Sequence, residues 1–217
     1  MELSKDFSST TYPLIRIKRG RFLDPVFEAY IRSNPKYTAW ERPSDEKIDK
    51  SIEAYRAAWQ DKEEDIVKTM CEAISLNFMQ NIVDVYVVSG NDRQFSDPVV
   101  IKSSFPPEEF VDTLVHELTH RLMSDNVQCA KQKIRMGIIF EKIFPGEPLL
   151  VRNHIITYAL NKHIFVDTLK DNCWTERTLG IIAGSAHLEY KKAWDIVENI
   201  GHMKVIEMVR KERENIS

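Results

Sequence analysis

The amino-acid sequence predicts an α+β fold, in which a small antiparallel or mixed sheet packs on a central helix and further helices complete the domain. Three observations support this prediction. Strand-length segments rich in β-branched residues lie in the first half of the chain, apolar residues then recur at helical spacing, and amphipathic segments fill the C-terminal part. The strand-like segments are residues 11–22, 81–90 and 97–104, and the central helix is expected at 106–125.

The composition is that of one globular domain. The chain has 217 residues, of which 43% are hydrophobic and 29% charged, so it is long enough and apolar enough to bury a core. We expect a single domain over residues 1–217. Its parts are an N-terminal region of one strand and helices (1–80), which could form a subdomain, a core that carries the candidate site (81–170), and C-terminal helices (171–217).

The charge pattern excludes several classes of partner. With 30 basic and 33 acidic residues the net charge is −3, which gives no support for a nucleic-acid partner. The basic run from Arg16 to Arg21 lacks interleaved aromatic residues and is expected to be a solvated strand face.

The sequence contains no run of about 18 apolar residues, so we expect no membrane-spanning segment. The start, MELSKDFSSTTY, lacks the apolar core of a signal peptide, and the three cysteines form no C-x-x-C pair. We therefore expect reduced thiols and a cytoplasmic location.

The N-terminal elements follow from local patterns. Residues 11–22 alternate apolar and basic side chains, which is typical of a strand with one wet face. A short helix over 24–34 is stopped by Pro35, and Ser44 with two following acidic residues begins a helix that runs to residue 60. A further helix is expected over 61–78.

The segments 81–90 and 97–104 are expected to pair as a hairpin, because a turn-like S-G-N-D follows the first of them. Pro106 and Pro107 suit a first helical turn, and the two glutamates that follow complement the helix dipole. Apolar residues at three- and four-residue spacing then predict the helix 106–125. Three more helices are expected, over 127–144, 149–170 and 186–213, the last with a break near Gly201.

The central helix carries the motif H-E-x-x-H at His116, Glu117 and His120. Residues four apart lie on one face of a helix, so both imidazoles can reach one metal ion, and Glu117 can reach a water molecule held by that ion. A catalytic zinc site needs three protein ligands and an open position for water, which the ion acidifies. A neighbouring carboxylate can take the proton and return it to a leaving amine.

This motif, on a helix preceded by strands, resembles the zincin metallopeptidases, and the layout is most similar to the small intracellular minigluzincin-like members. The resemblance covers residues 81–170. It implies a Zn²⁺ cofactor, His116 and His120 as ligands, Glu117 as general base, and hydrolysis of a peptide or protein substrate. By the same resemblance, residues 81–90 or 97–104 would form the edge strand that pairs with an extended substrate.

The third ligand has several candidates. His154 lies on the expected helix 149–170, which could pack antiparallel to the motif helix, and Tyr158 follows it one turn later, where its hydroxyl could stabilise an oxyanion. We therefore favour His154 as ligand, with Tyr158 as a candidate catalytic residue or a half-buried tyrosine. Glu141 stands at the spacing that gluzincins use, but without their N-E-x-x-x-D context. The remaining alternatives are Glu176, Glu189 or another residue.

The other histidines are expected to be isolated. His163 follows His154 by nine residues and so faces the opposite side of the same helix, and neither His187 nor His202 has a partner in its local sequence. Two alternative functions compete with the peptidase. One is an inactive zincin-like protein that serves as a protein-binding module, and the other is a metal-free helical regulator in which the motif is accidental.

Overall fold

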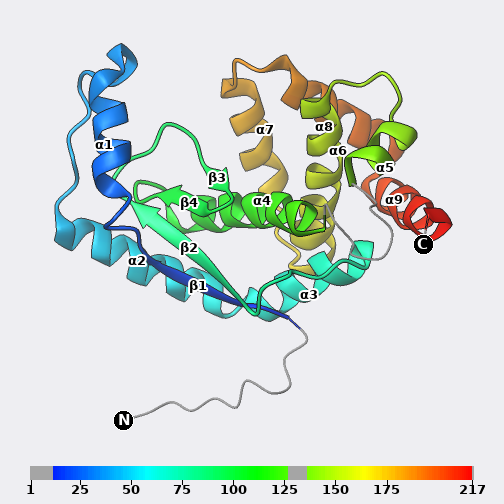
Figure 1. Cartoon of the computed structure of the whole chain (residues 1–217), viewed down its shortest axis with the longest axis horizontal. Helices are drawn as coiled ribbons and strands as arrows, with labels where there is room; N and C mark the ends of the chain where they lie inside the picture. The colour runs from blue at the N-terminus through cyan, green and yellow to red at the C-terminus, as the bar shows by residue number, and fades with distance from the viewer. Residues whose placement is uncertain (1–11, 127–135, 217) are drawn as a thin grey trace, which may run out of the picture.

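The computed structural model describes residues 12–126 and 136–216, and within them the chain has the predicted α+β class. Figure 1 shows the sheet towards one end of the molecule, the helices α6 to α9 towards the other, and α4 between them. The strands are β1 (Leu14–Arg19), β2 (Ile82–Val88), β3 (Phe95–Ser96) and β4 (Val99–Lys102). The α-helices are α1 (Asp24–Ser33), α2 (Asp45–Gln60), α3 (Glu63–Ile74), α4 (Pro107–Asp125), α5 (Met136–Ile143), α6 (Leu149–Lys162), α7 (Trp174–Gly184), α8 (Leu188–Ile200) and α9 (His202–Ile216).

The sheet is mixed, with the strand order β1-β2-β4-β3. β1 and β4 both run parallel to β2, and only β3 is antiparallel, to β4. The predicted hairpin between 81–90 and 97–104 is therefore wrong. The chain leaves β2, runs back as β3 and only then enters β4, so the hairpin partner of β4 is the two-residue strand β3. Val99, Val100 and Ile101 are all buried, as expected for an interior strand.

The strand order also corrects the predicted edge. β2 and β4 both lie inside the sheet, so neither 81–90 nor 97–104 offers a free edge, and the edges are β1 and β3. A hydrophobic pattern reports which faces of a strand are buried, but it does not report which strand is outermost.

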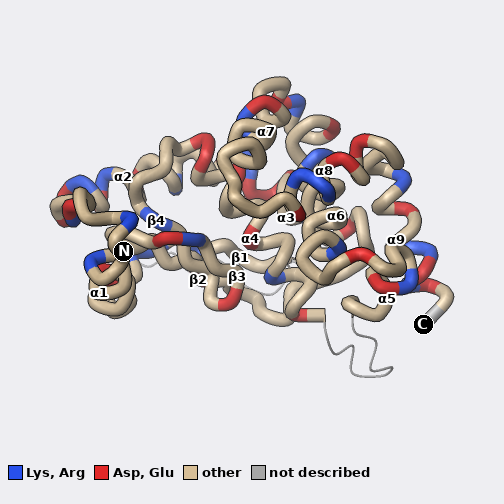
Figure 2. Tube along the Cα trace, turned by 90° about the horizontal axis from the view of Figure 1, so that it is seen from above, with Lys and Arg blue, Asp and Glu red and all other residues tan. Residues whose placement is uncertain are grey.

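One face of the sheet packs on helices, and on the other face the part formed by β1 and the start of β2 is exposed to solvent. Ile15 and Ile17 of β1 are buried with the alternate valines of β2, on the side of α2 and α4. On the opposite face Arg16 and Lys18 each form an ion pair of 2.6 Å with Asp84. The predicted wet strand face is thus confirmed, and Figure 2 shows basic and acidic positions interspersed along the chain.

α4 connects the two halves of the core. On the sheet side, Phe110 stacks on Tyr55 of α2 with ring centroids 3.9 Å apart, and the Tyr55 hydroxyl donates a hydrogen bond of 2.8 Å to the carbonyl oxygen of Phe105. On the other side α4 packs against α6. α6 is buried on most of its circumference from Val151 to Asn161, which is typical of a central helix.

The helical predictions hold in part. Ser44 caps α2 by accepting a hydrogen bond from the Lys47 amide, and a break at Gly201 separates α8 from α9. The prediction for 149–170 holds with one change, because α6 ends at Lys162 and continues as a π-helical turn, η2 (His163–Thr168). Of the helix predicted at 127–144, residues 127–135 lie outside the described part.

Helix α7 was not predicted. Its buried residues, Trp174, Thr178 and Ile182, recur every four positions, and that spacing is the pattern that could have revealed it. Among the described residues, no helix is long and apolar enough to cross a membrane.

A glycine just after β2 tests the packing of the sheet on α1. A Cβ atom at Gly90 would lie 2.6 Å from Trp40 Cζ2 and 2.9 Å from Ile31 Cδ1. We expect Gly90→Ala to lower the free energy of unfolding by about 1–3 kcal/mol, because both the Trp40 ring and the buried Ile31 side chain would have to shift to make room for the methyl group. Urea unfolding followed by circular dichroism measures this change.

The matched control is Gly180→Ala in the exposed part of α7, where an added Cβ meets nothing within 4 Å. We expect this change to be neutral or to raise stability by up to about 1 kcal/mol, because alanine is the better helix former. Equal effects at the two glycines would contradict the packing described for Gly90.

Candidate metal centre

The structure brings three histidines together from two helices. His116 and His120 lie one turn apart on α4, and their Nε2 atoms are 3.1 Å from each other. His154 of α6 faces both rings, with centroid distances of 5.3 Å to His116 and 5.0 Å to His120. One nitrogen atom from each ring lies within 4.8 Å of the other two. The cluster therefore offers three imidazole nitrogens to one point.

The packing of α4 on α6 holds the cluster in place. Leu118 and Leu122 are fully buried on the core side of α4, which turns His116 and His120 towards α6. Thr119 Oγ1 lies 2.9 Å from the Val115 carbonyl oxygen and 3.1 Å from Asn161 Oδ1, so a buried polar contact joins the two helices behind the histidines.

Burial keeps the three imidazoles uncharged. It lowers the pKa of His116 well below the ordinary value, with the neighbouring histidines adding to the effect, and it lowers the pKa of His120 to about 3. Burial also lowers the pKa of His154. The Nδ1 atom of His154 lies 2.8 Å from the Leu150 carbonyl oxygen, which can only accept. Nδ1 therefore carries the proton, and Nε2 keeps a free lone pair.

Glu117 is the one acidic residue of the motif, and burial raises its pKa to about 7. Within the described residues its carboxyl group makes no hydrogen bond and no ion pair. A half-buried carboxyl without a partner costs stability, so such a group is more common at functional sites than elsewhere.

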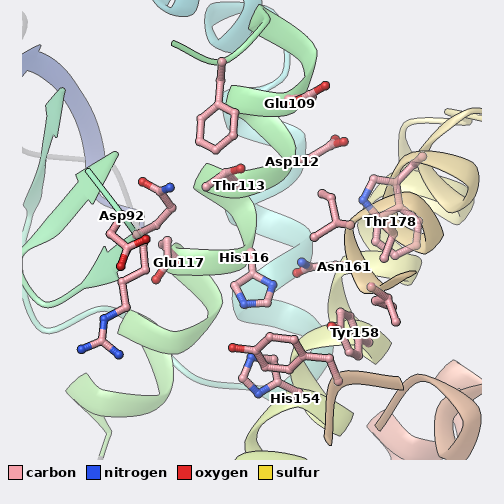
Figure 3. A pocket seen from close by; sticks show the side chains of 17 residues that line it. Asp92, Glu109, Asp112, Thr113, His116, Glu117, His154, Tyr158, Asn161 and Thr178 are labelled. Carbon is pink, nitrogen blue, oxygen red and sulfur yellow. The ribbon is translucent and has the colours of Figure 1, made fainter. Parts of the chain in front are cut away.

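His116 and Glu117 line a pocket of about 390 Å³ between the end of the sheet and helices α4, α6, α7 and α8. Figure 3 shows Asp92 and Glu117 on one side of His116, and Asn161 and Thr178 on the other. His154 and Tyr158 close the pocket below. His120 does not line this pocket but a second hollow, together with residues of α4, α5 and α6.

Tyr158 lies in this pocket but is only 6% exposed. Its ring centroid is 5.9 Å from that of His154, and it meets Trp194 edge to face at 5.6 Å. Burial, with a smaller contribution from Tyr190, raises its pKa. The tyrosine predicted from the sequence is thus beside the cluster and also part of the core.

Tyr190 of α8 was missed by the sequence analysis. Its ring lies 4.5 Å from that of His154, it lines the pocket, and burial together with the Glu117 carboxylate raises its pKa. No local motif marks this residue. The available indication was its place four residues before Trp194, on the side of α8 that packs against α6.

The other candidate ligands lie away from the histidines. Glu141 is on α5 with its side chain 69% exposed, and it pairs with Arg152 at 3.3 Å. Glu176 is exposed on α7, and Glu189 lies 4.0 Å from the exposed ring of His187. The structure does not bring any of these three glutamates into the cluster.

An ion pair fixes the wall that α7 contributes to the pocket. Arg177 of α7 donates to both carboxylate oxygens of the buried Asp112 on α4, at 2.6 and 2.9 Å, and to Asp171 at 2.7 Å. Burial raises the pKa of Asp112, and the opposing effect of Arg177 does not cancel it. Arg177 therefore compensates a carboxylate that would otherwise be costly to bury.

Removing this arginine should make stability depend more strongly on pH. We expect Arg177→Met to lower the free energy of unfolding by about 2–4 kcal/mol at pH 7.5, because Asp112 is left without its cation. Without the guanidinium group, the pKa of Asp112 in the folded state rises further. At lower pH the buried carboxyl group becomes protonated and no longer carries an uncompensated charge. The loss of unfolding free energy relative to wild type should therefore be smaller at pH 5 than at pH 7.5. Urea unfolding at both pH values measures the difference.

The control is the double variant Asp112→Asn with Arg177→Met, which has no buried carboxylate at this position. Its stability relative to wild type should change less between pH 5 and pH 7.5 than that of Arg177→Met alone. A loss in Arg177→Met that is equal at the two pH values would contradict the role given to the pair.

Comparison with known proteins found no matching family model, no matching curated protein and no matching solved structure. The histidine cluster and the unpaired Glu117 beside it therefore carry the functional assignment.

Proposed function

We propose that this protein is a zinc-dependent peptidase of the zincin type, in which His116, His120 and His154 hold Zn²⁺ and Glu117 is the general base and acid. One observation carries the proposal. Three uncharged imidazole nitrogens converge within 4.8 Å of one another, and a carboxyl group with a pKa of about 7 lines the same pocket as His116 and His154. A purely structural zinc site needs no such carboxyl group and is usually closed by a fourth protein ligand.

The residues fit the metal. Zinc takes neutral imidazole nitrogens at about 2.0–2.1 Å, which sets ligand atoms about 3.3 Å apart in a tetrahedral site. The Nε2 atoms of His116 and His120 are 3.1 Å apart, close to that separation. When bound, the ion would acidify a water molecule and polarise a carbonyl oxygen. The hydrogen bond from His154 Nδ1 to the Leu150 carbonyl orients the third ring.

Glu117 would act as the general base and then as the general acid. Its pKa of about 7 lies near neutral pH, where a group can both accept and return a proton efficiently. It would take a proton from the attacking water and deliver it to the amine nitrogen of the broken peptide bond. The hydroxyl groups of Tyr190 and Tyr158 would donate hydrogen bonds to the carbonyl oxygen as it gains charge.

The surroundings of the pocket favour an extended peptide as substrate. β3 is a sheet edge, and Asp92, Arg93 and Gln94, which directly precede it, line the pocket. An edge strand can pair with a substrate backbone through main-chain hydrogen bonds. By resemblance to zincins, β3 would take the role first assigned to 81–90 or 97–104. Buried Cys71 is a free thiol, which fits the proposed cytoplasmic location.

The test combines metal content with cleavage. We expect His116→Ala and His154→Ala each to bind one zinc ion per chain fewer than wild type, measured by elemental mass spectrometry. Glu117→Gln should keep the wild-type zinc content while cleavage of a mixture of unstructured peptides, followed by mass spectrometry, falls about 10²–10⁴-fold.

Glu141→Ala is the matched control, because it removes an exposed glutamate that was a candidate ligand, and it should keep both zinc and activity. Wild-type protein that binds no zinc after reconstitution would exclude the metallopeptidase. Zinc binding without cleavage of any peptide, in wild type as in Glu117→Gln, would instead favour the inactive binding module.

The two tyrosines should differ in their contributions. Tyr190 interacts electrostatically with Glu117, whereas Tyr158 packs more deeply against Trp194. We expect Tyr190→Phe to lower kcat/KM by about tenfold or more and Tyr158→Phe to lower it less, because each change removes only a hydroxyl group. Steady-state kinetics with a cleaved peptide measures both variants, with zinc content as the control. A larger loss in Tyr158→Phe would reverse the assignment.

A further inference from the structure

A second cluster of possible metal ligands lies at the other end of α6. Asp167 Oδ2 is 2.9 Å from His163 Nδ1 and 2.6 Å from His202 Nε2, so two imidazole nitrogens converge on one carboxylate oxygen. One ligand atom from each of the three residues lies within 4.8 Å of the other two. His163 and His202, which the sequence presents as isolated, are therefore neighbours.

The fold builds this cluster from two segments. α6 continues beyond Lys162 into the π-helical turn η2, and short π-helical segments occur frequently at functional sites. η2 places His163 and Asp167 on one side. Gly201, with φ of +90°, turns the chain sharply between α8 and α9 and sets His202 as the first residue of α9. A side chain at position 201 would be strained in that conformation.

We propose that His163, Asp167 and His202 form a second metal site, which binds Zn²⁺ and ties the end of α6 to the start of α9. Two imidazoles and a carboxylate favour zinc over magnesium or calcium, which prefer sites made of oxygen atoms. Bonds of about 2.0–2.2 Å would require the ligand atoms to separate from the observed distances to about 3.3 Å.

The surroundings allow an ion to enter. The three side chains are 22%, 37% and 19% exposed, so each can shift by a few tenths of an ångström without disturbing the core. His163 also lines a surface hollow beside α3 and α9, so this ligand can be reached from solvent. Glu72 and Arg210 line the same hollow with opposite charges, so Asp167 provides the net negative charge.

The two proposed metal sites have different roles. In the second cluster the carboxylate of Asp167 contacts both histidines and is itself a proposed ligand, whereas Glu117 of the first site is not a ligand. The three ligands of the second cluster come from the junction of two helices. A metal there would stabilise the C-terminal helices around α6, which also carries His154. It would do so whether or not the first site is a peptidase.

The test is a zinc titration of the untagged full chain against a chromogenic chelator at pH 7.5. We expect the wild type to bind two zinc ions per chain, and His163→Ala and His202→Ala to bind one ion fewer. His187→Ala removes an exposed histidine that directly precedes α8 and is the matched control, which should bind two zinc ions. A wild type whose zinc is lost entirely in His116→Ala overturns the second site.

His116→Ala separates this proposal from the peptidase. We expect His116→Ala to retain one zinc ion, and the combination with His202→Ala to retain none. Zinc should also raise the thermal midpoint of His116→Ala by a few degrees, because an ion that binds only the native state stabilises it.

The variant Asp167→Asn keeps the size of the side chain, so it tests the site even if the alanine variants fail to fold. In the His116→Ala background it should weaken zinc binding at least about tenfold and abolish the thermal shift. If the folded Asp167→Asn protein keeps both its zinc affinity and its thermal shift, then His163, Asp167 and His202 are joined by hydrogen bonds alone and do not hold a metal ion.

Discussion

The packing of α6 against α4 is the constraint on which the rest of the site depends. α4 alone can aim two imidazoles at one point, because His116 and His120 are four residues apart. A third nitrogen has to come from another element, and α6 supplies His154 because it is the central helix of the C-terminal half. The other walls are joined to this pair of helices: Arg177 of α7 forms an ion pair with Asp112 of α4, and the ring of Tyr190 on α8 lies tilted against that of His154.

Burial acts in opposite directions on the bases and acids of α4. It lowers the pKa values of the histidines and raises that of Glu117 to about 7, because a low-dielectric pocket shifts each group towards its neutral form. Asp112, one turn before His116 on the same helix, differs from Glu117 because its carboxylate forms an ion pair with Arg177. The contrast between a paired and an unpaired acid on one helix is a physical reason to place the chemistry at Glu117.

α6 and its π-helical continuation η2 contribute histidines to both clusters, on two sides of the molecule. His154 and His163 are nine residues apart, which turns them to opposite faces of a regular helix. The first faces α4, and the second meets α9 through Asp167. The sequence-based geometry was therefore right about the orientation of His163 and wrong about its isolation, because Asp167 and His202 complete a cluster that no local pattern reveals.

The sequence by itself determined the α+β class, the motif helix, the wet face of β1, and the spacing that sets His116 beside His120, because these features depend on neighbours within one or two turns. Only the tertiary structure decided the strand order, with β3 at the edge, and brought His154, Tyr190 and the trio around Asp167 to their places. Those contacts join segments far apart in the chain, and they follow from how buried faces fit together. Hydrophobic periodicity shows that a face is buried, but it does not show which partner covers it.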